Sequence, residues 1–254
     1  MNRYGYEIVK NENYWKLNPS GDINVIDYYE TVTGNYYLYK NTPYDAVANA
    51  IKNNLVFEKE VVDIASRYVK PGTVVLDVGA NYGQMAVLFS RMVGHNGLVY
   101  AFEAQKAVFS VLEKNIEANK LANVKLIYGA VYNKDNEILL FPAADLHQFG
   151  AFGSYGIDPA SKSGQKVNSI TIDSLCIEQP ISFMKVDIQG CDLFALQGAV
   201  ETIKKHKMPI IFEFEQQFQE DFGTNFGDYV DFVARIGYKF DRTVLDINYL
   251  IVPK

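Results

Sequence analysis

The chain of 254 residues is long enough for one α/β domain with an appendage, but it is short for two independent hydrophobic cores. Its composition, 48% hydrophobic and 21% charged, is that of a globular protein and argues against wholesale disorder. The formal net charge of −6 argues against nucleic acid as a partner, because Lys and Arg drive such binding.

The first 45 residues differ in composition from the rest of the chain. They hold nine of the eighteen tyrosines and the only tryptophan, Trp15. Aromatic side chains at this density need burial, so residues 1–55 are predicted to form an extension that packs on a main domain at 56–254. The extension could also cover the acceptor site or form a dimer contact, and a homodimer is possible.

From residue 56 onwards, stretches with the helical period alternate with short apolar runs typical of buried strands. Helices are predicted at 57–68, 85–92, 108–116, 193–205 and 229–235. Strands are predicted at 73–77, 98–103, 124–128, 137–141, 167–172, 181–187, 209–215, 238–240 and 249–252. This alternation predicts an α/β fold with a mostly parallel, Rossmann-like sheet and helices on both faces. The strands at 137–141 and 167–172 are extra, between the third and fourth core strands, and a loop at 143–166 separates them.

A glycine-rich turn, Asp77-Val78-Gly79-Ala80-Asn81-Tyr82-Gly83, follows the first strand of the sheet. Ligands of open α/β sheets bind at the carboxyl ends of the strands, and glycines allow the backbone to approach them closely. Glu103 ends the second strand, where a carboxylate can accept both ribose hydroxyls of an adenosine. The sequence therefore predicts an adenosine-containing cofactor at this edge.

A dinucleotide-binding enzyme could share these features. Its G-x-G-x-x-G pattern would need glycine at positions 81 and 84, where this chain has Asn81 and Gln84. The carboxylate of Asp77 would also repel a pyrophosphate, whereas it suits a cation. S-adenosylmethionine carries a sulfonium and an ammonium and no phosphate, so the pattern favours this cofactor.

Several motifs resemble the FkbM family of methyltransferases, collinearly over about residues 71–215. They are Val75-Leu76-Asp77-Val78-Gly79-Ala80-Asn81-Tyr82-Gly83, Ala101-Phe102-Glu103-Ala104, Asn115-Ile116, Asn119, Leu121, Asn123-Val124 and Met184-Lys185-Val186-Asp187-Ile188-Gln189-Gly190. The resemblance implies a class I methyltransferase fold and S-adenosylmethionine-dependent O-methylation, often of sugars, glycolipids or polyketides. It does not cover the first 45 residues.

The resemblance also implies which residues hold S-adenosylmethionine. The predicted set is Asp77, Gly79, Asn81, Tyr82, Gly83, Glu103, Ala104 and Ala130. Ala104 replaces the family's usual proline, which should change only the rigidity of the turn. Gln189 and Asp192 stand where glutamates are common, so a role that needs a charge at position 189 is in question.

Methyl transfer to a hydroxyl needs a general base, because an alcohol is a poor nucleophile until its proton is removed. Asp187, at the carboxyl end of the fourth core strand, is the first candidate, although it could instead cap the following helix. His147 in the 143–166 loop is the second, and Glu213 on the fifth strand is the third. Asp187 and Glu213 could also bind Mg²⁺ or Ca²⁺, so a divalent metal is possible but not expected.

The sequence thus predicts an S-adenosylmethionine-dependent O-methyltransferase that acts on a hydroxyl of a sugar or sugar nucleotide. A lipid or polyketide hydroxyl is an alternative acceptor, and a catalytically silent module that binds S-adenosylmethionine is a third possibility. The N-terminus carries no secretory signal and no apolar stretch is long enough to span a bilayer, so we expect a cytoplasmic protein.

Overall fold

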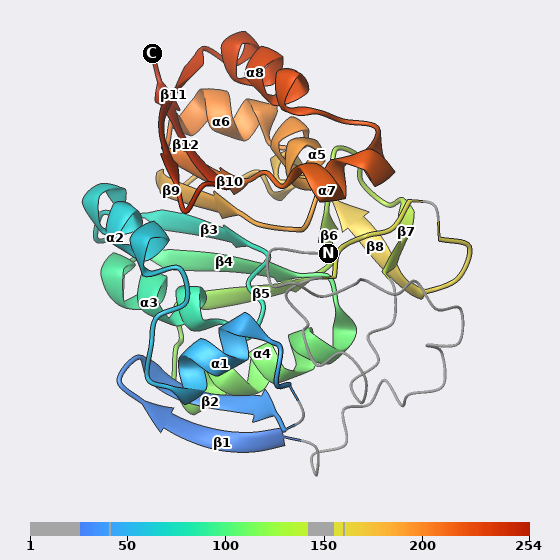
Figure 1. The fold of residues 1–254 in the computed structure, drawn as a ribbon. Helices are drawn as coiled ribbons and strands as arrows, with labels where there is room; N and C mark the ends of the chain where they lie inside the picture. The colour runs from blue at the N-terminus through green and yellow to red at the C-terminus, as the bar shows by residue number, and fades with distance from the viewer. Residues whose placement is uncertain (1–25, 41, 142–154, 160) are drawn as a thin grey trace.

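The computed structural model describes residues 26–40, 42–141, 155–159 and 161–254. Its centre is a seven-stranded sheet in the order β11-β12-β10-β9-β3-β4-β5 (Figure 1). These strands are β3 (Val74–Val78), β4 (Leu98–Glu103), β5 (Val124–Tyr128), β9 (Ile181–Val186), β10 (Ile210–Glu213), β11 (Tyr238–Val244) and β12 (Asn248–Pro253). Neighbours from β10 to β5 pair in parallel, and β12 is antiparallel to both of its neighbours. The predicted mostly parallel sheet is therefore confirmed.

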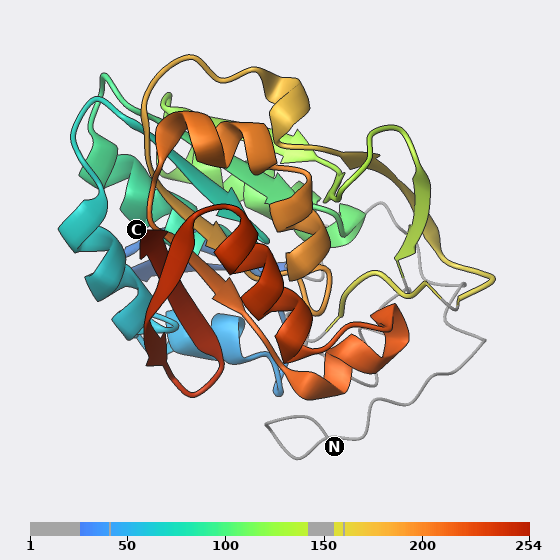
Figure 2. The same ribbon diagram turned by 90° about the horizontal axis from the view of Figure 1, so that it is seen from above.

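Helices cover both faces of this sheet (Figures 1 and 2). They are α2 (Lys59–Tyr68), α3 (Gln84–Val93), α4 (Lys106–Ala118), α5 (Asp192–Gln197), α6 (Val200–His206), α7 (Gln216–Gln219) and α8 (Phe226–Arg235). Every residue of β3 is buried, and successive side chains point to opposite faces. Val75 joins a core with residues of α2, α3 and α4, whereas Leu76 joins one with residues of α5, α6 and α8. The continuous apolar run of β3 therefore reflects burial on both sides.

The single helix predicted at 193–205 is wrong, because the chain forms two helices there, α5 and α6. The break lies at Gly198, where an added Cβ would stand 2.0 Å from the carbonyl oxygen of Tyr132. Asp173, which is far from α6 in the sequence, caps this helix, because its carboxylate accepts from the backbone N–H groups of Glu201 and Thr202. Helical periodicity could not reveal this cap, because it comes from a remote residue.

The extra strands predicted between the third and fourth core strands are present. They form a separate three-stranded sheet in the order β6-β8-β7, with β6 at Ala130–Val131, β7 at Ile138–Phe141 and β8 at Gln165–Ile170. Most of the loop between β7 and β8 lies outside the described residues.

The described part of the aromatic-rich extension contains a β-hairpin and a helix that sequence periodicity did not predict. The hairpin consists of β1 (Ile26–Thr31) and β2 (Gly34–Tyr39), and the helix is α1 (Ala46–Lys52). Tyr36 and Leu38 of β2 are fully buried in the same core as α4. Burial of these side chains explains part of the high aromatic content that distinguishes the first 45 residues.

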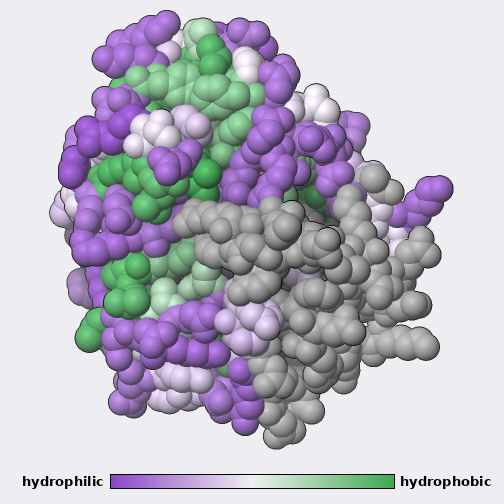
Figure 3. Space-filling view, viewed as in Figure 1, coloured by the Kyte–Doolittle hydropathy of each residue, from purple (hydrophilic) through white to green (hydrophobic). Residues whose placement is uncertain are grey.

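Hydrophilic residues are mixed with smaller hydrophobic areas where described residues form the face shown in Figure 3. Within the described ranges, no helix combines the length and the apolar character needed to cross a bilayer.

Candidate functional site

A pocket opens at the carboxyl ends of the parallel strands, where the sequence placed the cofactor. One wall of the pocket is formed by the turns after β3 and β4, and a second wall is formed by residues at the ends of β9 and β10. Residues before the main sheet also contribute. The lining includes Tyr44, Asp45, Phe57, Glu58, Gly79, Asn81, Gln84, Met85, Phe102, Glu103, Ala104, Gln105, Val108, Ala130, Tyr155, Lys185, Asp187, Gln189, Glu213, Glu215 and Phe218.

The turn after β3 requires glycine at position 79. Gly79 has φ +84°, and an added Cβ would lie 1.9 Å from the backbone oxygen of Asp187, at the end of the neighbouring strand. Two further hydrogen bonds hold the turn against β4, because the N–H groups of Gly79 and Ala80 both donate to the Phe102 oxygen. A side chain at position 79 would therefore separate the ends of β3 and β9.

Glu103 faces the pocket from the end of β4, and backbone donors hold its carboxylate in place. Its Oε2 accepts from the N–H of Asn81 at 3.0 Å, and its Oε1 accepts from the N–H of Gln105 at 2.7 Å. Burial raises the pKa of the Glu103 carboxyl to about 7, against the opposite effect of these backbone N–H donors. Each carboxylate oxygen can accept a second hydrogen bond, so Glu103 can still bind a ligand's hydroxyl groups.

Asp77 lies behind the pocket wall rather than on it. Its side chain is fully buried, and neither oxygen has a hydrogen-bond donor among the described residues. The nearest cation is Lys185, whose Nζ lies 3.9 Å from Oδ1. Burial raises the pKa of Asp77 to about 6, although the Lys185 charge acts in the opposite direction. Asp77 therefore supplies a negative field just below the turn.

Lys185 lies between the carboxylates of Asp77 and Asp187. Its side chain is 6% exposed, and its ammonium lies 3.1 Å from Oδ2 of Asp187 and donates to the backbone oxygen of Gly79 at 3.2 Å. Burial acts to lower the pKa of Lys185, but the charges of Asp187 and Asp77 outweigh it, and the pKa rises. Lys185 is therefore held as a cation beside the Asp187 carboxylate.

An amide links the two carboxyl groups on the opposite wall. The Nε2 of Gln189 donates to Oδ1 of Asp187 at 3.2 Å and to Oε2 of Glu213 at 2.7 Å. Burial raises the pKa of Glu213 well above its usual value, and the nearby charges of Asp187 and Asp192 add to the effect. Glu213 therefore holds a proton more readily than an ordinary glutamate. The family's usual glutamate at position 189 could not donate both bonds while ionised.

The helix-capping alternative for Asp187 finds no support in these contacts. The Asp187 carboxylate contacts the side chains of Lys185 and Gln189. Asp192 instead accepts from the backbone N–H groups of Ile188 and Gly190 before α5. Asp187 is thus directed into the pocket, with a side chain that is 17% exposed.

The structure brings most of the predicted site residues together. Gly79, Asn81, Glu103, Ala104, Ala130, Asp187 and Glu213 line the pocket, whereas Asp77, Tyr82 and Gly83 are not among the lining residues. His147 lies outside the described residues.

Sequence reasoning missed the pocket residues that precede the main sheet, above all Tyr44, Asp45 and Glu58. Glu58 begins α2 with φ +47° and is 8% exposed, which places a carboxylate inside the fold at a helix start. A charged residue next to the buried run of α2 looks in sequence like an ordinary helix N-terminus. Only its tertiary contacts, such as the hydrogen bond from Asn248 to Oε1, distinguish it.

Across the part of the chain that the structure describes, no group of three or more His, Cys, Asp or Glu side chains is arranged to hold a metal ion. The carboxyl groups of Asp187 and Glu213 are linked by hydrogen bonds from the Gln189 amide.

Comparison with protein families gives two matches. The model described as the methyltransferase FkbM domain matches residues 77–240, which is more than half of the chain. The model for protein-L-isoaspartate(D-aspartate) O-methyltransferase matches residues 15–133, which is less than half.

One curated relative is the probable cobalt-precorrin-6B C(15)-methyltransferase (decarboxylating) of Sulfolobus acidocaldarius. It is 38% identical over 71 residues, which cover 27% of this chain and 37% of that protein. The match thus spans little more than a third of the relative's length.

Two solved structures can be aligned with the chain. Methyltransferase FkbM from Methylobacillus flagellatus aligns with a TM-score of 0.46 at 14% identity, over 82% of this chain and 52% of that one. A SAM-dependent methyltransferase from Aquifex aeolicus aligns with a TM-score of 0.42 at 18% identity, over 76% of this chain and 87% of that one.

Proposed function

Since the chain belongs to the FkbM family of S-adenosylmethionine-dependent methyltransferases, we propose that it transfers a methyl group to a hydroxyl of a sugar or sugar nucleotide. One observation carries the proposal: Glu103, the expected ribose ligand, and Asp187, the expected base, line the same pocket.

The residues of the pocket fit S-adenosylmethionine. Glu103 has free acceptor capacity for the ribose hydroxyls, and Val108 and Ala130 give an apolar surface for the adenine. The cofactor is cationic when bound, and it supplies an electrophilic methyl group on its sulfonium. Buried carboxylates near the turn favour such a cation, and the fully buried Asp77, one residue before the end of β3, is one of them. The same carboxylates would repel a pyrophosphate, which is negatively charged.

Asp187 is the proposed general base. Asp187 would accept the proton of the acceptor hydroxyl while that hydroxyl's oxygen takes up the methyl group. The Lys185 ammonium forms an ion pair with this carboxylate, at an Nζ–Oδ2 distance of 3.1 Å. The wall around it excludes water and aligns the reacting groups, which is the main contribution a protein can make to an in-line displacement.

Glu213 is better suited to orient the acceptor than to remove its proton. Its raised pKa favours the protonated form, which can donate a hydrogen bond. Gln189 fixes Glu213 and Asp187 relative to each other. An acceptor hydroxyl between them would donate to Asp187 and accept from Glu213, and this arrangement supports the order in which Asp187 precedes Glu213 as the base.

The lining also favours a polyhydroxylated acceptor. Carboxyl and amide groups that can bond hydroxyls alternate there with aromatic rings, which can pack against the apolar faces of a sugar. The aromatic residues of the lining are Tyr44, Phe57, Phe102, Phe141, Tyr155 and Phe218. A purely apolar acceptor, such as the chain of a lipid, would leave the buried polar groups without partners, which is costly.

The test is incubation of the protein with methyl-labelled S-adenosylmethionine and a panel of free sugars, nucleotide sugars, hydroxylated lipids and RNA. We expect label on a sugar, with a methyl ether identified by mass spectrometry, and no label with Asp187→Asn. Label only on a hydroxylated lipid or only on RNA would contradict the proposed acceptor class, and a methyl group on carbon would refute O-methylation. Binding without transfer to any acceptor would favour a catalytically silent module.

A further inference from the structure

The turn that is expected to hold the cofactor contacts the N-terminal part of the chain at three places. We call residues 79–84 the cofactor turn, and we call residues 33–40 and 42–58 the docking segment. The contacts run through Asn115 of α4, through the Tyr82 hydroxyl and through the Gln84 side chain. The docking segment is therefore more than a cover over the pocket.

Asn115 joins the two parts with a fully buried amide. Its Oδ1 accepts from the N–H of Tyr37 at 2.6 Å, and its Nδ2 donates to the oxygen of Tyr37 at 3.2 Å. The same Nδ2 donates to the backbone oxygen of Tyr82 at 2.8 Å. Asn115 thus pairs with β2 as a neighbouring strand would, and it bonds the cofactor turn at the same time.

Asn119, the residue that caps the C-terminus of α4, pairs with β2 in the same way, and its Nδ2 also donates to the backbone oxygen of Asn115 at 2.7 Å. Its Oδ1 accepts from the N–H of Asn35 at 2.9 Å, and its Nδ2 donates to the oxygen of Asn35 at 2.6 Å. No described contact joins Asn119 to the cofactor turn. The two asparagines therefore hold β2 alike, but Asn115 alone of this pair also reaches Tyr82.

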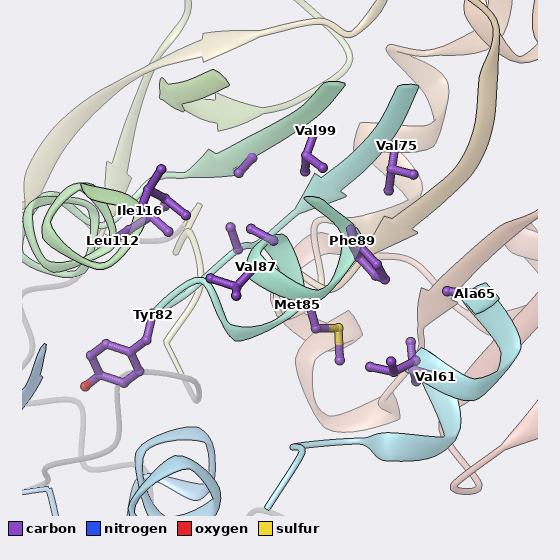
Figure 4. Close-up of a cluster of buried hydrophobic side chains, with 14 of the residues drawn as sticks. Val61, Ala65, Val75, Tyr82, Met85, Val87, Phe89, Val99, Leu112 and Ile116 are labelled. Atoms are coloured by element: carbon purple, nitrogen blue, oxygen red, sulfur yellow. The ribbon is translucent and has the colours of Figure 1, made fainter. Parts of the chain in front are cut away.

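The other two contacts are made by side chains of the cofactor turn itself. Figure 4 shows the Tyr82 ring at the edge of the core, directed away from Met85, and its hydroxyl lies 3.5 Å from Oδ2 of Asp45. The buried Gln84 side chain donates to the backbone oxygen of Leu55 at 2.8 Å, and its Oε1 accepts from the N–H of Phe57 at 2.8 Å. The docking segment thus bonds the turn directly, and three of the residues that make these contacts, Asp45, Phe57 and Gln84, also line the pocket.

We propose that the docking segment is a working part of the cofactor site and that Asn115 is the positioning residue that couples its docking to S-adenosylmethionine binding. The inference rests on the cofactor site proposed above. If β2 leaves α4, the Asn115 amide loses the partner that orients it toward Tyr82, and the turn keeps only its bonds to β4 and Glu103 on that side of the sheet. A ligand that needs the ordered turn therefore favours the docked segment, and the coupling is reciprocal by linkage.

The first measurement uses the unmodified chain. S-adenosylhomocysteine is titrated by calorimetry, and hydrogen exchange of residues 33–40 is followed with and without it. Among the described residues, none of β1 or β2 lines the pocket, so protection there reports coupling rather than contact. We expect exchange about tenfold slower with saturating ligand. Binding without any change at 33–40 would overturn the inference, whereas absence of binding would instead overturn the cofactor site beneath it.

The second measurement compares Asn115→Ala with Asn119→Ala, because both remove the bonds to one residue of β2. We expect Asn115→Ala to weaken S-adenosylhomocysteine binding about tenfold and to abolish the ligand-induced protection of residues 33–40. Asn119→Ala should keep the affinity within about twofold and retain the protection. Equal losses in the two variants would reduce Asn115 to a structural residue and overturn the coupling. The measurement on the unmodified chain decides the question even where a variant does not fold.

Discussion

The cofactor site can be tested through the titration of Glu103. Burial raises the pKa of this carboxyl to about 7 in the ligand-free protein. A protonated carboxyl loses part of its capacity to accept bonds from the ribose hydroxyls, so the ligand should bind the ionised form. Below pH 7 binding must therefore expel a proton, and the affinity should rise as the pH rises.

The size of the effect follows from the ionised fraction. With a pKa of about 7, roughly a tenth of Glu103 is ionised at pH 6 and about nine tenths at pH 8, and the apparent dissociation constant scales inversely with that fraction. S-adenosylhomocysteine should accordingly bind about tenfold more weakly at pH 6 than at pH 8. Calorimetry in buffers with different ionisation heats would also record the released proton.

Glu103→Gln is the control, because Asp77 and Asp192 also have raised pKa values, about 6 and about 7. The variant should bind about 10- to 100-fold more weakly at pH 8, as expected for lost hydrogen bonds to a charged group of about 1.5–3 kcal/mol. Its affinity should no longer change between pH 6 and 8. A pH dependence that persists in the variant, or wild-type affinity at pH 8, would refute the role of Glu103.

The remaining predictions concern the base and the metal. Asp187→Asn should lower kcat by about 10²–10⁴-fold while S-adenosylhomocysteine affinity stays within about threefold, and a near-wild-type kcat would remove Asp187 as the base. His147→Ala, assayed alongside, should leave most of the activity, and a large loss there with a silent Asp187→Asn would move the base to the 143–166 loop. EDTA should leave methyl transfer unchanged; loss of activity that Mg²⁺ restores would instead indicate a metal held by Asp187 and Glu213.

The sequence alone determined the parallel sheet and the region of the cofactor site. The strand from Val74 to Val78 is rich in β-branched residues and apolar except for Asp77, and this pattern predicts a strand correctly because both of its faces are buried. Gly79 and Glu103 follow strands directly, so local order was enough to place them at one edge of the sheet. These patterns involve residues close together in the sequence, so they can be interpreted without knowledge of the packing.

Tertiary structure decided the features that depend on residues far apart in the chain. Helix α6 begins where Asp173 caps it, and Gln189 bridges Asp187 to Glu213, 24 residues further on. The hairpin is held by Asn115, 78 residues away from its partner Tyr37. An asparagine within a helix gives no sign of its partner in the sequence, since its side-chain bonds depend on which backbone the fold brings beside it. The walls of the pocket that come from the N-terminal segment were therefore fixed only when the chain packed.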